Sequence, residues 1–302
     1  MAKRNGRRGQ AGRDTTRTRW QELAARALSA IVYAPLLLAL AYFGNPWLLI
    51  GMLALGGLAL WEYVYLVRTM GLAMQRVTAG ALALGFFLWP YSLIWAGYAE
   101  LVILPPLFFT LIVLCSLWAL LLPRAQGHTQ VFTGWAMAVA GAMYIGWLLG
   151  HTVALRDYIY VRGELWLIFA LVVTWAYDTG AYLVGRGIGK RRIFQHLSAG
   201  KTLEGTLGGA FVAVMVAALY AQFTPFPLSP ILAGLIGLGA AVVAQLGDLV
   251  ESLLKRGAEV KESGTLIPGH GGVLDRIDSL LFTGPYMFYA ALIWASLQLG
   301  AQ

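Results

Sequence analysis

The residues best suited to chemistry follow an apolar run that ends near residue 247, where acidic and basic side chains recur at helical spacing. They are Asp248, Glu251, Ser252, Lys255 and Arg256, at positions i, i+3, i+4, i+7 and i+8. This spacing places two carboxylates and two cations on one face of a helix. The alternative is a ladder of salt bridges, but ladders belong on exposed helices, and this helix emerges from an apolar span. We therefore expect a functional face.

A second acidic pair follows the glycine-rich stretch 268–272. Asp275 and Asp278 stand at i and i+3 near the expected start of a helix, so both can point at one site. Carboxylates beside cations suit Mg²⁺, which takes one or two protein carboxylates and completes its shell with water and phosphate oxygens. Gly271 and Gly272 allow the backbone to approach a ligand closely. His270 is weak evidence by itself, because a loop histidine with an ordinary partner is an equal alternative.

Asp178 lies inside the apolar run 165–184. A carboxylate at that depth costs several kcal/mol unless it is paired or hydrated, so we expect a functional role for it rather than a structural one. Glu62 and Glu100 lie near the ends of apolar runs. Their side chains can reach the membrane surface, and we expect neither of them to be functional.

The stretch 185–205 combines glycines with Lys and Arg and contains Ser198, Lys201 and Thr202. Exposed backbone N–H groups and cations together suit a polyphosphate. Gly200, Lys201 and Thr202 imitate the end of a P-loop, but Gln195 occupies the place of the required glycine, so a P-loop is excluded. The alternative is an ordinary basic loop in water.

The elements that position these residues must be membrane helices. The 302 residues are 59% hydrophobic and 12% charged, with a mean hydropathy of +0.69. Because soluble domains are roughly a quarter charged, a soluble enzyme, a disordered protein and a coiled coil are excluded. We expect an all-α polytopic membrane protein. The single cysteine, Cys115, excludes an internal disulfide and cysteine-based zinc or iron–sulfur sites.

Apolar stretches long enough to cross a bilayer recur along the whole chain. We expect about nine transmembrane helices, near 27–43, 46–66, 78–97, 101–122, 131–149, 165–184, 206–223, 229–247 and 280–300. With the N-terminus in the cytoplasm and the C-terminus outside, all Lys and Arg except Arg156 and Arg162 fall on the cytoplasmic side. Both polar loops, 185–205 and 248–279, are then cytoplasmic.

Three regions follow from this pattern. Residues 1–26 hold eight Lys and Arg against Asp14 and Glu22 and form a basic cytoplasmic arm. The arm lacks interleaved aromatic residues, so we expect it to contact anionic lipid headgroups and not nucleic acid. Residues 27–164 form the N-terminal transmembrane helices. Residues 165–302 form a catalytic transmembrane region that carries the two cytoplasmic loops.

Carboxylates for a divalent cation, several cations and glycine-rich turns indicate phosphoryl or nucleotidyl transfer. The membrane setting suggests that one substrate is a lipid. A sharper expectation comes from a resemblance over residues 165–279. The stretches 178–182, 198–205 and 247–251, and above all the pattern running from Ser252 through Lys261 and 268–272 to Asp278, resemble the phosphatidate cytidylyltransferase family. Glu262 departs from the family pattern, which usually has Asp there.

The resemblance implies that CTP and phosphatidate react to give CDP-diacylglycerol and diphosphate with Mg²⁺. A second cation is compatible with it. We also expect a homodimer. On this basis the expected metal ligands are Asp248, Asp275 and Asp278, with Glu251 and Asp178 as close supports. The phosphate-binding candidates are Lys201, Lys255, Arg256 and Arg276, and Ser198, Thr202 and His270 are further candidates for hydrogen bonds to substrate. The expected location is a bacterial cytoplasmic membrane.

Three rival functions can be distinguished by their products or by the residues that they leave unexplained. A CTP-dependent lipid kinase would release CDP instead of diphosphate. A cation-coupled transporter would use Asp178 and Asp248 as ion sites but does not explain the clustered cytoplasmic Lys and Arg. A structural scaffold leaves the polar C-terminal half without a purpose.

Overall fold

A computed structural model of the protein describes residues 32–90, 113–114, 127–159, 162–266 and 271–299. The described parts are helical, and an isolated antiparallel bridge joins Arg192 to Thr202. The labelled helices are α2 (Trp47–Thr69), α3 (Arg76–Phe87), α6 (His128–Gly141), the π-helix η3 (Ala142–Trp147), α7 (Leu148–Asp157), α8 (Gly163–Ile188), α9 (Leu203–Phe223), α10 (Pro230–Gly257) and α11 (Leu274–Leu299). A further short helix covers Val32–Phe43.

Six helical stretches of the described chain are long and apolar enough to cross a membrane. They are α2, the continuous stretch Thr129–Asp157 that includes η3, α8, α9, α10 and α11. The expected spans near 27–43 and 78–97 correspond to the shorter apolar helices Val32–Phe43 and Arg76–Phe87. The expected span at 101–122 lies almost wholly outside the described residues, as does the arm at 1–26. The all-α membrane architecture is confirmed, and the count of nine stays a prediction.

The C-terminal helices pack in chain order, with α9 between α8 and α10 and α11 against α10 and α7. Small residues allow the close approach of α8 and α9. A Cβ atom added at Gly209 would lie 2.8 Å from the carbonyl oxygen of Tyr177, and one added at Gly205 would lie 2.8 Å from that of Ala181. Without a hydrophobic driving force between helices in lipid, such close backbone packing supplies much of the association energy.

The polar segments are shorter than the sequence pattern indicates, because helix extends into both ends of the expected loop 248–279. Helix α10 is capped at its start by the Ser229 side chain, continues past residue 247, and ends at Gly257. Helix α11 already begins at Leu274. Asp248 and Asp278 therefore lie on helices, as their spacing predicts, and residues 258–273 join the two helices.

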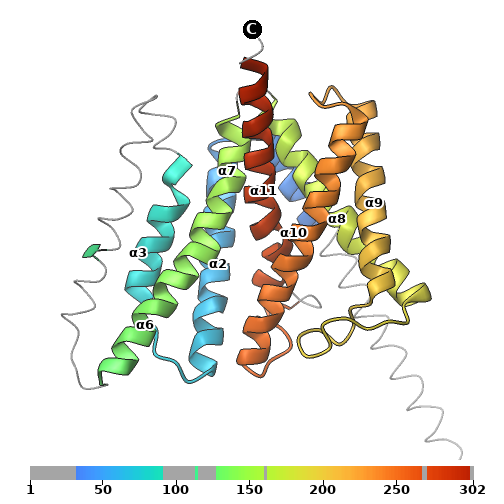
Figure 1. Cartoon of the computed structure of the whole chain (residues 1–302). Helices are drawn as coiled ribbons and strands as arrows, with labels where there is room; N and C mark the ends of the chain where they lie inside the picture. The colour runs from blue at the N-terminus through green and yellow to red at the C-terminus, as the bar shows by residue number, and fades with distance from the viewer. Residues whose placement is uncertain (1–31, 91–112, 115–126, 160–161, 267–270, 300–302) are drawn as a thin grey trace, which may run out of the picture.

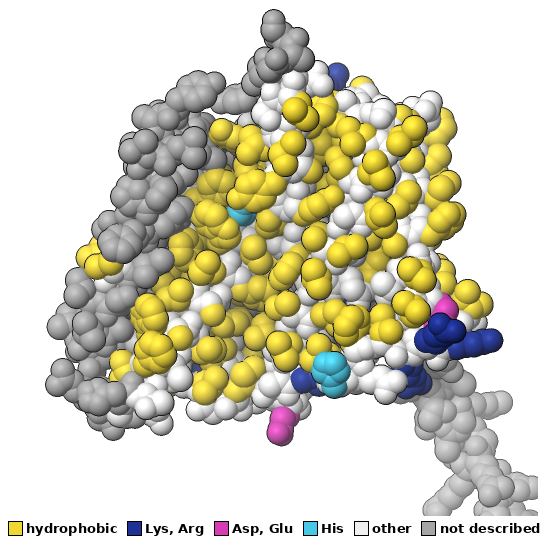
Figure 2. All heavy atoms as spheres, viewed as in Figure 1, with side chains coloured by type: hydrophobic (Ala, Val, Ile, Leu, Met, Phe, Trp, Pro, Cys, Tyr) yellow, Lys and Arg dark blue, Asp and Glu magenta, His cyan; other side chains and the backbone are white. Residues whose placement is uncertain are grey.

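All the polar connections that the expected site uses lie at one end of the bundle, opposite the C-terminus. The connection from α8 to α9 and the connection from α10 to α11 both lie at the lower end in Figure 1. Figure 2 shows hydrophobic side chains over the middle of this face and most of its charged side chains along the lower edge. The bundle therefore presents an apolar belt with a polar end.

The packing of α8 on α9 predicts opposite results for two glycine substitutions. Gly209→Ala forces a methyl group against backbone and should destabilise the protein by about 1–3 kcal/mol. Gly57→Ala is the matched control, because nothing lies within 4 Å of a Cβ atom at that position of α2, and it should be neutral or slightly stabilising. Thermal unfolding in detergent measures both, and equal melting temperatures would contradict the packing described.

Candidate functional site

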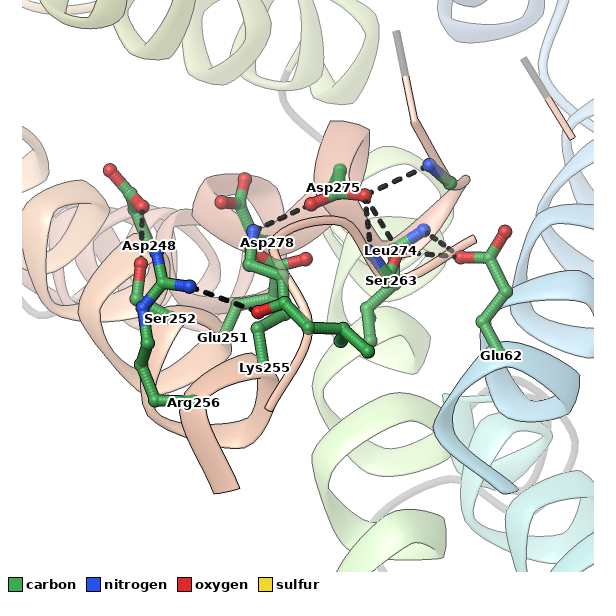
Figure 3. A network of polar contacts seen from close by, with 12 residues as sticks. Glu62, Asp248, Glu251, Ser252, Lys255, Arg256, Ser263, Leu274, Asp275 and Asp278 are labelled. Carbon is green, nitrogen blue, oxygen red and sulfur yellow. Dashed lines mark hydrogen bonds and ion pairs between the residues drawn. The ribbon is translucent and has the colours of Figure 1, made fainter. Parts of the chain in front are cut away.

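Three carboxylates from two helices form the centre of the candidate site. Asp248 and Glu251 lie on α10 and Asp278 lies on α11, and one oxygen from each lies within 4.8 Å of the others. Glu251 has no exposed side-chain surface. We call Asp248, Glu251 and Asp278 the acidic cluster; Figure 3 shows its members side by side. Two of the three expected metal ligands thus share one place.

Close contact between α10 and α11 brings the acidic cluster together. Gly247 precedes Asp248, and a Cβ atom added there would lie 2.5 Å from the carbonyl oxygen of Asp278. Any larger residue would push the start of α11 away from α10. The three-residue spacing of Asp248 and Glu251 then turns both carboxylates to the face of α10 that meets α11.

Two lysines neutralise part of the charge. Lys201, from the connection between α8 and α9, pairs with Asp248. Lys255 pairs with Glu251 one turn earlier on α10 and with Asp275, where Nζ lies 2.6 Å from Oδ1. Carboxylates this close repel one another strongly away from bulk water. The acidic cluster and Asp275 together outnumber the two lysines, and the surplus negative charge favours a bound cation.

The donor atoms of the acidic cluster suit a hard divalent cation, which prefers carboxylate oxygens and water. Glu251 Oε1 is buried and has no hydrogen-bond partner among the residues that the structure describes. A buried oxygen without a partner is costly, so a ligand or a water molecule at this position would stabilise the folded protein. The arrangement therefore fits a cation that keeps part of its hydration shell.

Asp275 lies beside the acidic cluster, joined to Glu251 through Lys255, and its oxygens are occupied by protein donors. Its Oδ2 atom accepts hydrogen bonds from the backbone N–H groups of Ser263 (2.8 Å) and Gly272 (2.9 Å) and from the Ser263 hydroxyl (2.8 Å). Its Oδ1 atom accepts from Lys255. Gly271 needs to be glycine, because its φ is +77° and a Cβ atom there would lie 2.7 Å from Asp275 Oδ2. Asp275 therefore organises the segment before α11.

The connection between α8 and α9 reaches the acidic cluster through Lys201, while its neighbours have local partners. Thr202 caps α9 by accepting a hydrogen bond from the Gly205 N–H (3.1 Å). Glu204 accepts from the N–H groups of Lys190 and Arg191, which closes the loop. Ser198 is half-buried, and its N–H donates to the Phe194 carbonyl.

The remaining expected site residues lie around this centre. Arg256 donates to the carbonyl oxygens of Leu197 and Val260, at 3.0 Å each, so it ties the two polar connections together. The exposed Arg276 is close enough to Asp178, on α8, for their opposite charges to attract each other. His270 lies outside the described residues. Glu262, the departure from the family pattern, is exposed.

The expectation that the Glu62 side chain reaches the membrane surface is wrong, because this side chain is buried. Only 2% of Glu62 is exposed. Its carboxylate accepts hydrogen bonds from the N–H groups of Val273 (2.9 Å) and Leu274 (2.8 Å) and from the Ser263 hydroxyl (2.9 Å). Figure 3 shows it beside the segment that Asp275 organises. The signal available in the sequence was an acid within an apolar run, as for Asp178. Glu100 lies outside the described residues.

Tyr144 is a further residue that the sequence pattern did not indicate. It lies on the π-helix η3, and its hydroxyl is buried without a hydrogen-bond partner among the described residues. It is close enough to the three carboxylates of the acidic cluster to interact with them electrostatically. Single-turn π-helices often occur at functional sites. A tyrosine in an apolar run is ordinarily a packing residue, which is why its place was not predictable.

Comparisons with known proteins extend over nearly the whole chain. The model of the "Cytidylyltransferase family" matches residues 24–294. A phosphatidate cytidylyltransferase of Bacillus subtilis is 33% identical over 277 residues, which are 91% of this chain and 99% of that protein. One of Haemophilus influenzae is 34% identical over 283 residues, with 88% and 98% covered. One of Synechocystis is 44% identical over 131 residues, with 43% and 44% covered.

Cation binding can be measured without turnover. Mn²⁺, followed by its paramagnetic resonance signal in detergent, should bind the protein, and Asp248→Asn or Asp278→Asn should weaken binding roughly tenfold or more, because each removes one carboxylate from the acidic cluster. Asp157→Asn is the matched control, since Asp157 lies at the end of α7 and pairs with Arg156. Equal losses in all three variants would argue against a site at the acidic cluster.

Proposed function

Because this chain belongs to the cytidylyltransferase family, we propose that its acidic cluster is the centre of a phosphatidate cytidylyltransferase. The enzyme transfers the cytidylyl group of CTP to phosphatidate, which gives CDP-diacylglycerol and diphosphate for phospholipid biosynthesis. The observation that carries this conclusion is a match to relatives of that name over nine-tenths of the chain. It is a multi-pass membrane enzyme.

The reaction depends more on alignment than on proton transfer. A phosphate oxygen of phosphatidate attacks the α-phosphorus of CTP. The bond from that phosphorus to the oxygen that bridges to the β-phosphate breaks, and diphosphate leaves with the electron pair. A phosphate monoester is largely ionised near neutral pH, so the attacking oxygen needs no strong general base. The protein's task is to hold two highly charged substrates in line and to stabilise the charge that develops.

The acidic cluster is our candidate for holding Mg²⁺. Bound there, the ion would neutralise phosphate charge and orient the reacting oxygens. Support comes from the three converging carboxylates and the unpartnered Glu251 Oε1. In this scheme Asp275 contributes by holding Lys255 and the segment before α11, and Asp178 adds negative charge from α8. A second cation would be accommodated near Asp178.

Cations from three elements surround the acidic cluster and are our candidates for binding the phosphates. Lys201, from the α8–α9 connection, pairs with Asp248, and Arg276, on α11, interacts electrostatically with Asp178. Lys255 holds Glu251 and Asp275 and can shift toward a phosphate when a cation replaces its charge. Arg256 acts mainly by fixing both connections. Ser198, Thr202 and His270 remain candidates for hydrogen bonds to CTP.

We further propose the orientation of the protein in its membrane. The distribution of Lys and Arg supports a cytoplasmic N-terminus, an external C-terminus and nine spans in a bacterial cytoplasmic membrane. The position of the polar connections opposite the C-terminus fits this orientation (Figure 1). CTP then reaches the acidic cluster from the cytoplasm and phosphatidate from the adjoining leaflet. We also propose that residues 27–164 form an N-terminal transmembrane region, that residues 165–302 form the catalytic region, and that the protein is a homodimer.

The direct test gives the purified protein CTP, phosphatidate and Mg²⁺ and measures CDP-diacylglycerol and diphosphate. The native chain should form both, and Asp278→Asn should lower kcat roughly 100-fold, because one carboxylate of the acidic cluster loses its charge. Asp157→Asn should retain activity. Release of CDP instead of diphosphate would identify a lipid kinase, and full activity of Asp278→Asn would refute the assignment of the acidic cluster.

Lys201 offers a separate test of phosphate binding. Lys201→Met should raise KM for CTP about tenfold, because a charge-assisted hydrogen bond to phosphate is lost. Its affinity for Mn²⁺ should not fall, since Asp248 loses a competing cation. Steady-state kinetics at varied CTP, together with the Mn²⁺ titration, separates these effects. An unchanged KM would remove Lys201 from the binding site.

A further inference from the structure

Glu62 connects the N-terminal half of the chain to the segment that carries Asp275. It lies on α2, yet the hydrogen bonds that its carboxylate accepts from described residues come from Ser263, Val273 and Leu274, just before and at the start of α11. We infer that Glu62 is a positioning residue for the reaction: it fixes the start of α11, and through it the places of Asp275 and Asp278.

The first part of the argument is the helix start. The first N–H groups of a helix have no partner within the helix, and a nearby residue usually caps them. Here the cap comes from a residue 211 and 212 positions away, which binds the N–H groups of Val273 and Leu274. A carboxylate at this end also interacts favourably with the helix dipole. Glu62 therefore defines where α11 begins relative to α2.

The second part is a shared serine. The Ser263 hydroxyl lies 2.9 Å from Glu62 Oε2 and 2.8 Å from Asp275 Oδ2, so the two carboxylates share its single proton. Lys255 continues the connection from Asp275 to Glu251 in the acidic cluster. An unbroken series of polar contacts thus joins α2 to the acidic cluster (Figure 3).

The third part is the fit of the backbone around Glu62. A Cβ atom added at Gly264 would lie 2.6 Å from Glu62 Oε1, and one added at Gly272 would lie 2.3 Å from Oε2 and 2.2 Å from Ser263 Oγ. Glycines at both positions let the segment fold closely over the carboxylate. An apolar side chain would pack in α2 without the cost of burying a charge. The contacts of this carboxylate instead serve the segment before α11.

Glu62→Gln tests the inference, because glutamine keeps the size but replaces one accepting oxygen with a donor. We expect kcat to fall roughly tenfold or more and the half-saturating Mg²⁺ concentration to rise, as when a residue that orients metal ligands is lost. KM for phosphatidate should stay unchanged. Hydrogen exchange of the Val273 and Leu274 amides should become faster, since one of them loses its acceptor.

The matched control is Tyr63→Phe. Tyr63 is the next residue of α2 and is also buried, but its hydroxyl donates to the Met137 carbonyl and not to a residue before α11. It should leave kcat, the Mg²⁺ dependence and the exchange of the Val273 and Leu274 amides unchanged. A loss of activity that is equal in both variants, or that follows their melting temperatures, would mean that Glu62 serves only stability and would overturn the inference.

If Glu62→Gln does not fold, Ser263→Ala tests the inference in its place. It should itself lower kcat. Where Glu62→Gln folds, the double variant should lose less than the sum of the two single losses, because the Ser263 hydroxyl is one of the contacts of Glu62. Additive losses, or wild-type kinetics with unchanged exchange, would refute the inference. The kinetic readouts rest on the proposed function, whereas hydrogen exchange does not. An inactive native chain would therefore count against the function alone.

Discussion

The structure depends on how four carboxylates are held together at the end of an apolar bundle. Asp248, Glu251, Asp275 and Asp278 meet where α10 and α11 cross, and charges of one sign repel strongly when little water separates them. Lys201 and Lys255 compensate part of this charge. The negative charge that remains is the feature on which the proposed cation site depends.

The bundle meets this cost with close helix contacts and with donors from distant parts of the chain. Gly247 brings the backbone of α11 against α10, and Gly205 and Gly209 bring α9 against α8. Lys201 thereby reaches Asp248 from the start of α9. Arg256 fastens the same connection to the end of α10 through the Leu197 carbonyl. Backbone proximity therefore decides which cations face which carboxylates, more than side-chain type does.

Local periodicity made part of the site predictable. The helical spacing of 248, 251 and 255 is real, and Asp278 joins Asp248 as expected. Spacing could not separate Asp278, which joins the cluster, from Asp275, whose oxygens meet backbone N–H groups instead. The apolar stretch ends at residue 247, but the helical spacing of the polar residues that follow correctly predicted that the helix continues, and it ends at Gly257. Glu62 was missed since its partners lie 211 positions away, beyond any local pattern.

The contacts of Glu62 also bear on the division of the chain at residue 165 into an N-terminal and a catalytic region. By composition the chemistry belongs to residues 165–302, and the earlier helices read as a membrane scaffold. Yet two N–H groups at the start of α11 find their acceptor on α2, and without it they would be buried and unsatisfied. Helix α11 also packs against α7. The C-terminal half is therefore a unit of composition rather than of folding, and the acidic cluster takes its shape from both halves of the chain.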